Sequence, residues 1–194
     1  MGRLVLILGG ARSGKSAIAE RMAREWGGRV TFVATAEAHD DEMRQRIRAH
    51  QAARPSGWRT VEEPLNLGDA VRRAVVESDT VLVDCLTLWI SNLLCRLEPP
   101  ASDEGWASVP DQLTPEVEAT AMSLLDAAGS SDATILVVSN EVGLGLVPPY
   151  PLGRVYRDLL GYLNRRLAAE ADQVLLMVAG LPLDVKRLAL GGLP

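Results

Sequence analysis

The 194-residue chain is poor in the residues that build disulfide frameworks and zinc sites, with only two cysteines and two histidines. Cys85 and Cys95 are too few for either structure, so we expect two reduced thiols. No apolar run approaches the ~18–20 residues that span a bilayer, and the N-terminus enters a strand without a signal-peptide pattern. We therefore expect a cytoplasmic protein with no membrane contact.

The chain also lacks a basic block and has few aromatic residues. Its formal net charge is −5, and the arginines at positions 44, 46 and 48 are preceded by three acids at positions 40–42. Nonspecific nucleic-acid binding requires many Lys and Arg contacts to phosphates, so we expect no nucleic-acid partner. With one Phe and three Tyr, the core must be filled by Leu, Val, Ile and Ala.

The clearest motif lies at the N-terminus, where the apolar run Leu4–Leu8 meets a glycine-rich turn. The turn fits G-x-x-x-x-G-K-[ST], a phosphate-binding P-loop between a strand and a helix. Its backbone N–H groups and the start of the helix would bind phosphate, Lys15 would neutralise the outer phosphates, and the hydroxyl of Ser16 would bind Mg²⁺. The predicted loop consists of Gly9, Gly10, Ala11, Arg12, Ser13, Gly14, Lys15 and Ser16.

Apolar strands and amphipathic helices alternate along the rest of the chain. The strands are apolar on both faces, which favours an α/β fold with a mostly parallel sheet covered on both sides. We predict one domain over residues 1–194, without internal repeats. The expected strands are 4–8, 29–34, 58–62, 80–84, 134–139 and 173–179, and the expected helices are 15–26, 41–53, 66–76, 86–97, 116–128 and 152–170.

Polar residues follow several of these strands at the edge where ligands bind in open α/β sheets. They are Thr35–Glu37, Asp84 and the segment 140–143. Asp84 ends an apolar strand, as in the Walker B pattern, and would hold Mg²⁺ together with Ser16. The alternative is that Asp84 only caps the following helix.

Residues 98–115 hold four prolines and show no periodicity. We expect a surface excursion, in which Trp106 is a lid residue, a subunit contact or a loop anchor; we favour one of the last two.

The helix 41–53 carries a histidine on its apolar face. Met43, Ile47 and His50 share that face at helical spacing. Arg54 lies one turn beyond His50, so both side chains would reach the same phosphate group if one were bound there. By position alone, burial of His50 against the core is the simpler interpretation.

Several blocks together resemble one family over essentially the whole chain, apart from the excursion at 98–115. They include GGARSGKS, VATAE, LVDCLTLWISNLL and SNEVGLGLVP, and the most specific is His50, Arg54 and Pro55 followed by Trp58 and Glu62. The chain resembles the bifunctional adenosylcobinamide kinase / adenosylcobinamide-phosphate guanylyltransferase family of cobalamin synthesis.

This resemblance implies two reactions in a RecA-like P-loop fold. Adenosylcobinamide would be phosphorylated on its aminopropanol hydroxyl with ATP or GTP. GMP would then pass from GTP to adenosylcobinamide phosphate through a covalent intermediate on His50. The resemblance also implies a homotrimer, with Lys15 and His50 catalytic and with a nucleotide site made of Gly9–Ser16, Thr35, Ala36, Glu37, Ala53, Arg54, Pro55, Glu62 and Asp84.

The chemistry agrees with this assignment. A neutral imidazole avoids the repulsion between substrate phosphate and GTP, and it divides one difficult transfer into two. Two alternatives remain from the residues: another small-molecule P-loop kinase in which His50 is structural, and a RecA-like ATPase acting on a macromolecule. The sequence does not locate the corrinoid site, select the phosphoryl donor, or establish that both half-reactions are retained.

Overall fold

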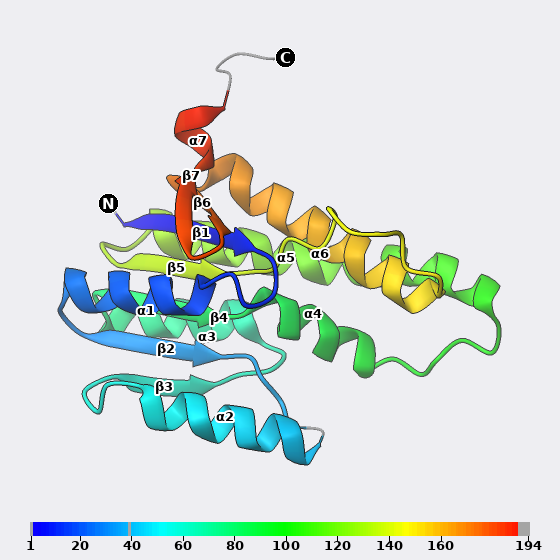
Figure 1. The fold of residues 1–194 in the computed structure, drawn as a ribbon, viewed down its shortest axis with the longest axis horizontal. Helices are drawn as coiled ribbons and strands as arrows, with labels where there is room; N and C mark the ends of the chain where they lie inside the picture. Colours follow the sequence, from blue (N-terminus) through cyan, green and yellow to red (C-terminus); the bar gives the residue numbers. More distant parts are fainter. Residues whose placement is uncertain (1, 39, 190–194) are drawn as a thin grey trace.

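A computed structural model describes residues 2–38 and 40–189 of the chain. Seven strands form one sheet in the order β3-β2-β4-β5-β1-β6-β7 (Figure 1). Neighbouring strands are parallel except for the antiparallel pair β6–β7. The strands are β1 (Arg3–Gly9), β2 (Val30–Ala34), β3 (Arg59–Glu62), β4 (Thr80–Asp84), β5 (Thr134–Val138), β6 (Gln173–Val178) and β7 (Leu181–Asp184).

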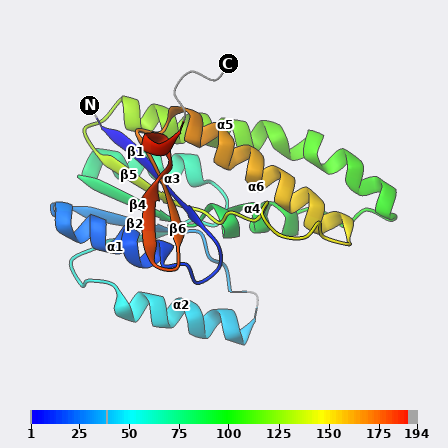
Figure 2. The same ribbon diagram turned by 45° about the horizontal axis from the view of Figure 1, so that its top comes forward.

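Helices cover both faces of this sheet (Figures 1 and 2). Along β1, Leu4 and Leu6 join a core built with α3, α4, α5 and α6, whereas Val5 and Ile7 join a second core built with α1. The expected three-layer α/β fold with a mostly parallel sheet is therefore confirmed. The helices are α1 (Lys15–Trp26), α2 (Asp41–Ala53), α3 (Leu67–Glu77), α4 (Leu86–Cys95), η1 (Asp103–Ser108), α5 (Val109–Gly129), α6 (Pro151–Glu170) and α7 (Val185–Leu188).

Strand β5 separates the two strands that carry the predicted phosphate and cation residues. Val138 of β5 is paired with Ile7 of β1 on one side and with Asp84 of β4 on the other. Because all three strands are parallel, the P-loop after β1 and the carboxylate of Asp84 lie at the same edge of the sheet.

The expectation of an aperiodic excursion over 98–115 is partly wrong. Helix α5 begins at Val109, seven residues before the predicted start at Glu116, and contains Pro115. Proline in a helix interior removes one hydrogen bond, but Val109, Leu113 and Val117 are all buried on one face. Burial therefore outweighs the proline. Trp106 packs against the same core, as expected of a loop anchor.

Strand β7 was not predicted. The chain turns after β6 through Ala179 and Gly180, both with positive φ, and Leu181–Asp184 returns antiparallel to β6. Strand β7 contains Pro182, which is tolerated because β7 lies at the edge of the sheet.

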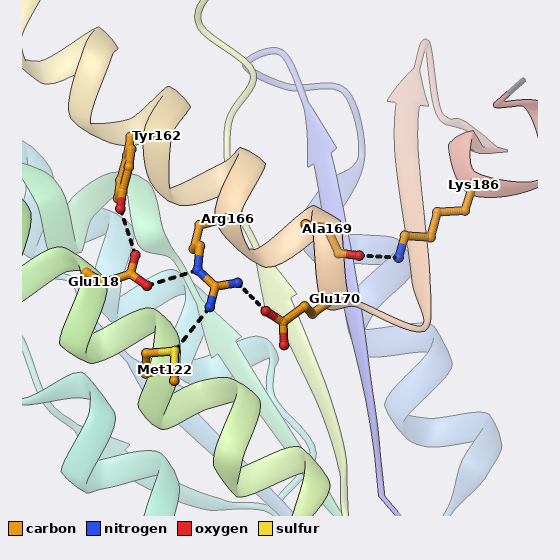
Figure 3. A network of polar contacts seen from close by, with 7 residues as sticks. All are labelled: Glu118, Met122, Tyr162, Arg166, Ala169, Glu170 and Lys186. Atoms are coloured by element: carbon orange, nitrogen blue, oxygen red, sulfur yellow. Dashed lines mark hydrogen bonds and ion pairs between the residues drawn. The ribbon is translucent and has the colours of Figure 1, made fainter. Parts of the chain in front are cut away.

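Side-chain contacts join α5, α6 and α7 on the outer layer (Figure 3). Glu118 accepts hydrogen bonds from Tyr162 Oη at 2.8 Å and from Arg166 Nε at 2.9 Å. Lys186 Nζ donates to Ala169 O at the end of α6, at 3.1 Å.

Among the described residues, every helix is too short or too polar to span a membrane.

Asn92 of α4 joins the ends of two strands inside the protein. Its buried side-chain amide donates to Thr35 O at 2.8 Å and to Pro64 O at 3.1 Å. These carbonyls follow β2 and β3, so one side chain holds two segments at the edge that carries the P-loop.

We expect Asn92→Leu to lower the free energy of unfolding by about 2–4 kcal/mol, because it leaves two buried carbonyls without a donor. Urea denaturation measures the change. The matched control is Gln112→Ala on the exposed face of α5, which should change stability by no more than about 0.5 kcal/mol. Equal, small effects of both substitutions would contradict this role of Asn92.

Candidate active site

The P-loop needs glycine at its first position. Gly9 has φ +154°, and a Cβ there would lie 2.6 Å from Ser13 Oγ and 2.7 Å from Met177 O. Gly14 caps α1 in the left-handed region, with φ +95°. These two glycines allow the chain to turn directly from β1 into α1, so that the N–H groups at the start of α1 are available to an anion.

Two groups in this turn fit a bound polyphosphate. Lys15 is 8% exposed, and its Nζ donates to Gly10 O at 2.7 Å. Burial lowers the pKa of Lys15, while the negative charge of Asp84 acts in the opposite direction. Within the described part of the chain, the buried Ser13 Oγ has no hydrogen-bond partner. An anion would supply the missing contacts.

The two predicted cation ligands are in contact. The Ser16 hydroxyl hydrogen-bonds to Asp84. Burial raises the pKa of Asp84, whereas the contact with Ser16 and the charges of His50, Arg54 and Lys15 lower it. The described residues contain no cluster of three His, Cys, Asp or Glu side chains able to hold a metal. A hydroxyl and a carboxylate suit Mg²⁺, which would take its other ligands from phosphate and water.

Thr35 ties the end of β2 to the residue after Asp84. Its hydroxyl donates to Cys85 O at 2.7 Å and accepts from Cys85 N at 2.8 Å, and the side chain is fully buried. The hydroxyl is therefore committed to the protein backbone. Thr35 positions the site and does not line it.

An open cavity of about 720 Å³ lies at this edge, a volume typical of small-molecule sites. It brings together seven of the predicted site residues: Ser16, Ala36, Glu37, His50, Arg54, Glu62 and Asp84. Pro55 does not line it, and the side chain of Ala53 lies outside the described residues. Gly10, Ala11 and Arg12 of the P-loop are exposed.

His50 is exposed and lines this cavity, so burial against the core is wrong. Met43 and Ile47, on the same face of α2, line it as well. The apolar face of α2 thus faces the cavity and not the sheet, while Figure 1 shows α2 outside the edge strand β3. His50 is near enough to Asp84 to favour its carboxylate form.

The guanidinium of Arg54 is held by contacts with Phe32 and Thr60, and part of its hydrogen-bonding capacity is unused. Its guanidinium carbon lies 3.7 Å from the centre of the Phe32 ring, and Nη1 is 3.5 Å from Thr60 Oγ1. Its Nε is buried and, among the described residues, has no partner. Burial lowers the pKa of Arg54, against the influence of Asp84, Glu20 and Glu62. A phosphate would provide the acceptor that this guanidinium lacks.

Sequence reasoning assigned no role to Thr87 and Leu88, which line the cavity together with Asn140. The position of Asn140 after β5 indicated a ligand-facing residue. The N–H of Asn140 donates to Thr87 Oγ1 at 3.0 Å, a contact between distant segments that no local pattern signals.

The glycine turn, the buried lysine and the Ser16–Asp84 pair define a P-loop nucleotide-binding protein, and an exposed histidine lines the same cavity. The family model described as cobinamide kinase / cobinamide phosphate guanyltransferase matches residues 5–185. The chain belongs to this family of kinases and nucleotidyltransferases.

Curated relatives extend over nearly the whole chain. The bifunctional adenosylcobalamin biosynthesis protein CobP of Pseudomonas aeruginosa is 46% identical over 181 residues, covering 93% of this chain and 96% of the relative. The bifunctional adenosylcobalamin biosynthesis protein CobU of Salmonella typhimurium is 37% identical over 185 residues, covering 94% and 99%. The protein of the same name from Escherichia coli is 36% identical over 183 residues, with the same coverage.

Solved structures with a similar chain course are more distant. A KaiC-like protein from Pyrococcus horikoshii has a TM-score of 0.46 at 16% identity and covers 90% of this chain and 70% of its own. The RadB recombinase has a TM-score of 0.46 at 17% identity, with coverage of 90% and 74%.

The two cysteines should differ sharply in reactivity. Burial, and then the charge of Asp84, raise the pKa of Cys85 to about 11, so at pH 8 only about one thiol in a thousand is ionised. Cys95 is exposed. We expect Ellman's reagent at pH 8 to titrate one thiol rapidly, and the slow thiol to react faster as the pH rises towards 11.

Cys95→Ser should remove the rapid phase, and Cys85→Ser should leave it intact. A rapid phase that survives Cys95→Ser would contradict the assignment.

Proposed function

We propose that this chain phosphorylates the aminopropanol hydroxyl of adenosylcobinamide and then transfers GMP from GTP to the resulting phosphate, through a guanylyl group on His50. The observation that carries this proposal is the exposure of His50 in the same cavity as Ser16, Arg54 and Asp84. Because His50 is exposed, its imidazole is not part of the packed core. The guanylyl transfer of this family gives such an imidazole a role as nucleophile.

The kinase reaction requires the γ-phosphoryl group to be held in line and its charge to be neutralised. Lys15 and the N–H groups of the P-loop hold the phosphates, and Ser16 and Asp84 would hold Mg²⁺. Bound Mg²⁺ would neutralise charge on the phosphates. ATP and GTP both present the triphosphate that these residues bind.

Guanylyl transfer takes place at the α-phosphorus. A nitrogen of His50 attacks it, the bond to the bridging oxygen breaks, and pyrophosphate leaves. An oxygen of adenosylcobinamide phosphate then attacks the same phosphorus and breaks the P–N bond. The product is adenosyl-GDP-cobinamide, and His50 is regenerated. The guanidinium of Arg54, one turn beyond His50, would stabilise the charge on the transferring phosphate.

Glu62 would accept hydrogen bonds from the N–H groups of guanine. Its carboxylate lines the cavity and accepts from Gln51 Nε2 at 2.7 Å, so it is already oriented by α2. We also propose that one domain performs both reactions, in a cytoplasmic homotrimer.

His50→Ala should abolish the covalent GMP adduct and lower guanylyl transfer by about three orders of magnitude or more, because the nucleophile is removed. Kinase turnover should stay within about threefold, since His50 has no part in holding the γ-phosphoryl group. Incubation with α-labelled GTP measures the adduct, which acid should release and base should not.

The control is Gln45→Ala, an exposed residue of α2 that does not line the cavity; it should leave both activities unchanged. Unaltered guanylyl transfer in His50→Ala would refute the intermediate and leave an ordinary P-loop kinase.

Lys15→Ala should lower both activities by about two to three orders of magnitude, because both transition states lose the same phosphate-binding charge. Lys186→Ala, the substitution of the other lysine of the chain, should leave both unchanged. Assays with γ-labelled and α-labelled GTP separate the reactions. Loss of only one activity in Lys15→Ala would show that the triphosphate binds differently in the two reactions.

A further inference from the structure

Four large apolar side chains are exposed between β5 and α6. Leu144 is 86% exposed, Leu146 96%, Val147 64% and Tyr150 65%. Single exposed apolar residues are common on protein surfaces, but a cluster within one short segment indicates an interaction site. We refer to residues 143–150 as the apolar loop.

The apolar loop is held in place by its own contacts. Arg154 Nη1 donates to Pro148 O at 3.1 Å and to Pro149 O at 2.9 Å. At the other end, Gly143 N donates to Glu141 Oε1 at 2.7 Å. These bonds and the consecutive prolines fix the backbone while the apolar side chains point into solvent.

The loop is continuous with the wall of the active-site cavity. It follows Asn140, which lines the cavity, and Glu141, whose N–H donates to Gly9 O of the P-loop at 3.1 Å. It therefore leaves the sheet between the P-loop and Asp84. Figure 1 shows this segment running alongside the N-terminal half of α6, beyond the carboxyl ends of the strands.

The apolar loop and helix α2 leave different parts of the same sheet edge. Helix α2, with His50, lies beyond β2 and β3, whereas the apolar loop leaves from β5, next to β1 (Figures 1 and 2). The apolar loop therefore begins beside the P-loop, whereas strand β4 separates β5 from the strands next to α2.

We propose that the apolar loop binds the corrin macrocycle of the substrate, an inference that rests on the function proposed above. The cavity of about 720 Å³ has the size of a small-molecule site, and in this proposal the macrocycle lies on the surface that adjoins it. Leu144, Leu146, Val147 and Tyr150 offer apolar contacts to the face of that ring. The aminopropanol arm then enters the cavity towards the γ-phosphoryl group.

The test is the double substitution Leu144→Ser and Leu146→Ser, which removes exposed side chains and should not disturb folding. We expect KM for adenosylcobinamide in the kinase reaction to rise by about ten- to a hundredfold, because apolar contact area is lost. KM for GTP and the yield of the GMP adduct should stay within about twofold, because neither involves the corrinoid.

The matched control is Leu181→Ser with Leu188→Ser, in β7 and α7, where the side chains are 68% and 70% exposed and do not line the cavity. It should leave the KM for adenosylcobinamide unchanged. Equilibrium dialysis of adenosylcobinamide without nucleotide, followed by corrinoid absorbance, measures the dissociation constant directly. The loop variant should raise that constant, and the control should not.

An unchanged dissociation constant and KM in the loop variant would overturn the proposal. So would dissociation of the oligomer in sedimentation experiments while corrinoid binding is retained, because the loop would then be a contact between copies of the chain. Failure of the wild-type protein to form the GMP adduct would refute the guanylyl step alone, since dialysis still tests the loop.

Discussion

The hydroxyl of Thr35 holds together the edge of the sheet on which the site is built. It both donates to and accepts from the backbone of Cys85, so the end of β2 cannot shift relative to the end of β4 without breaking two buried hydrogen bonds. Asn92 extends this connection to the segment after β3. The carboxylate of Asp84 and the chain that leads into α2 are thereby placed relative to one another.

Under the proposed function, this arrangement would let one triphosphate serve two reactions. Lys15, Ser16 and Asp84 gather at the P-loop, where the outer phosphates would bind, and His50 and Arg54 approach from α2. Because α2 presents its apolar face to the cavity, its histidine stays accessible. In the proposed function, the same cavity would serve attack at the γ-phosphorus by a hydroxyl and attack at the α-phosphorus by an imidazole.

Strong local signals explain which elements could be predicted. The P-loop, the buried parallel strands and the helix of His50 follow from glycine positions, apolar runs and helical spacing. The start of α5 could not be predicted, because burial of Val109 and Leu113 by distant helices outweighs the local effect of Pro115. Strand β7 was missed because its residues are stabilised as a strand by pairing with β6, and Pro182 is tolerated only at an edge.

The sequence alone determined the phosphate-binding turn, the alternation of strands and helices, and the chemical types of the reacting groups, since these depend on neighbouring residues. Tertiary structure decided that β5 lies between β1 and β4, that the hydroxyl of Thr35 bonds to the backbone of Cys85, and that His50 is exposed in the cavity and not buried. These outcomes depend on contacts between residues far apart in the chain. The packing of the whole sheet and its helices sets those contacts, and no short stretch of sequence carries that information.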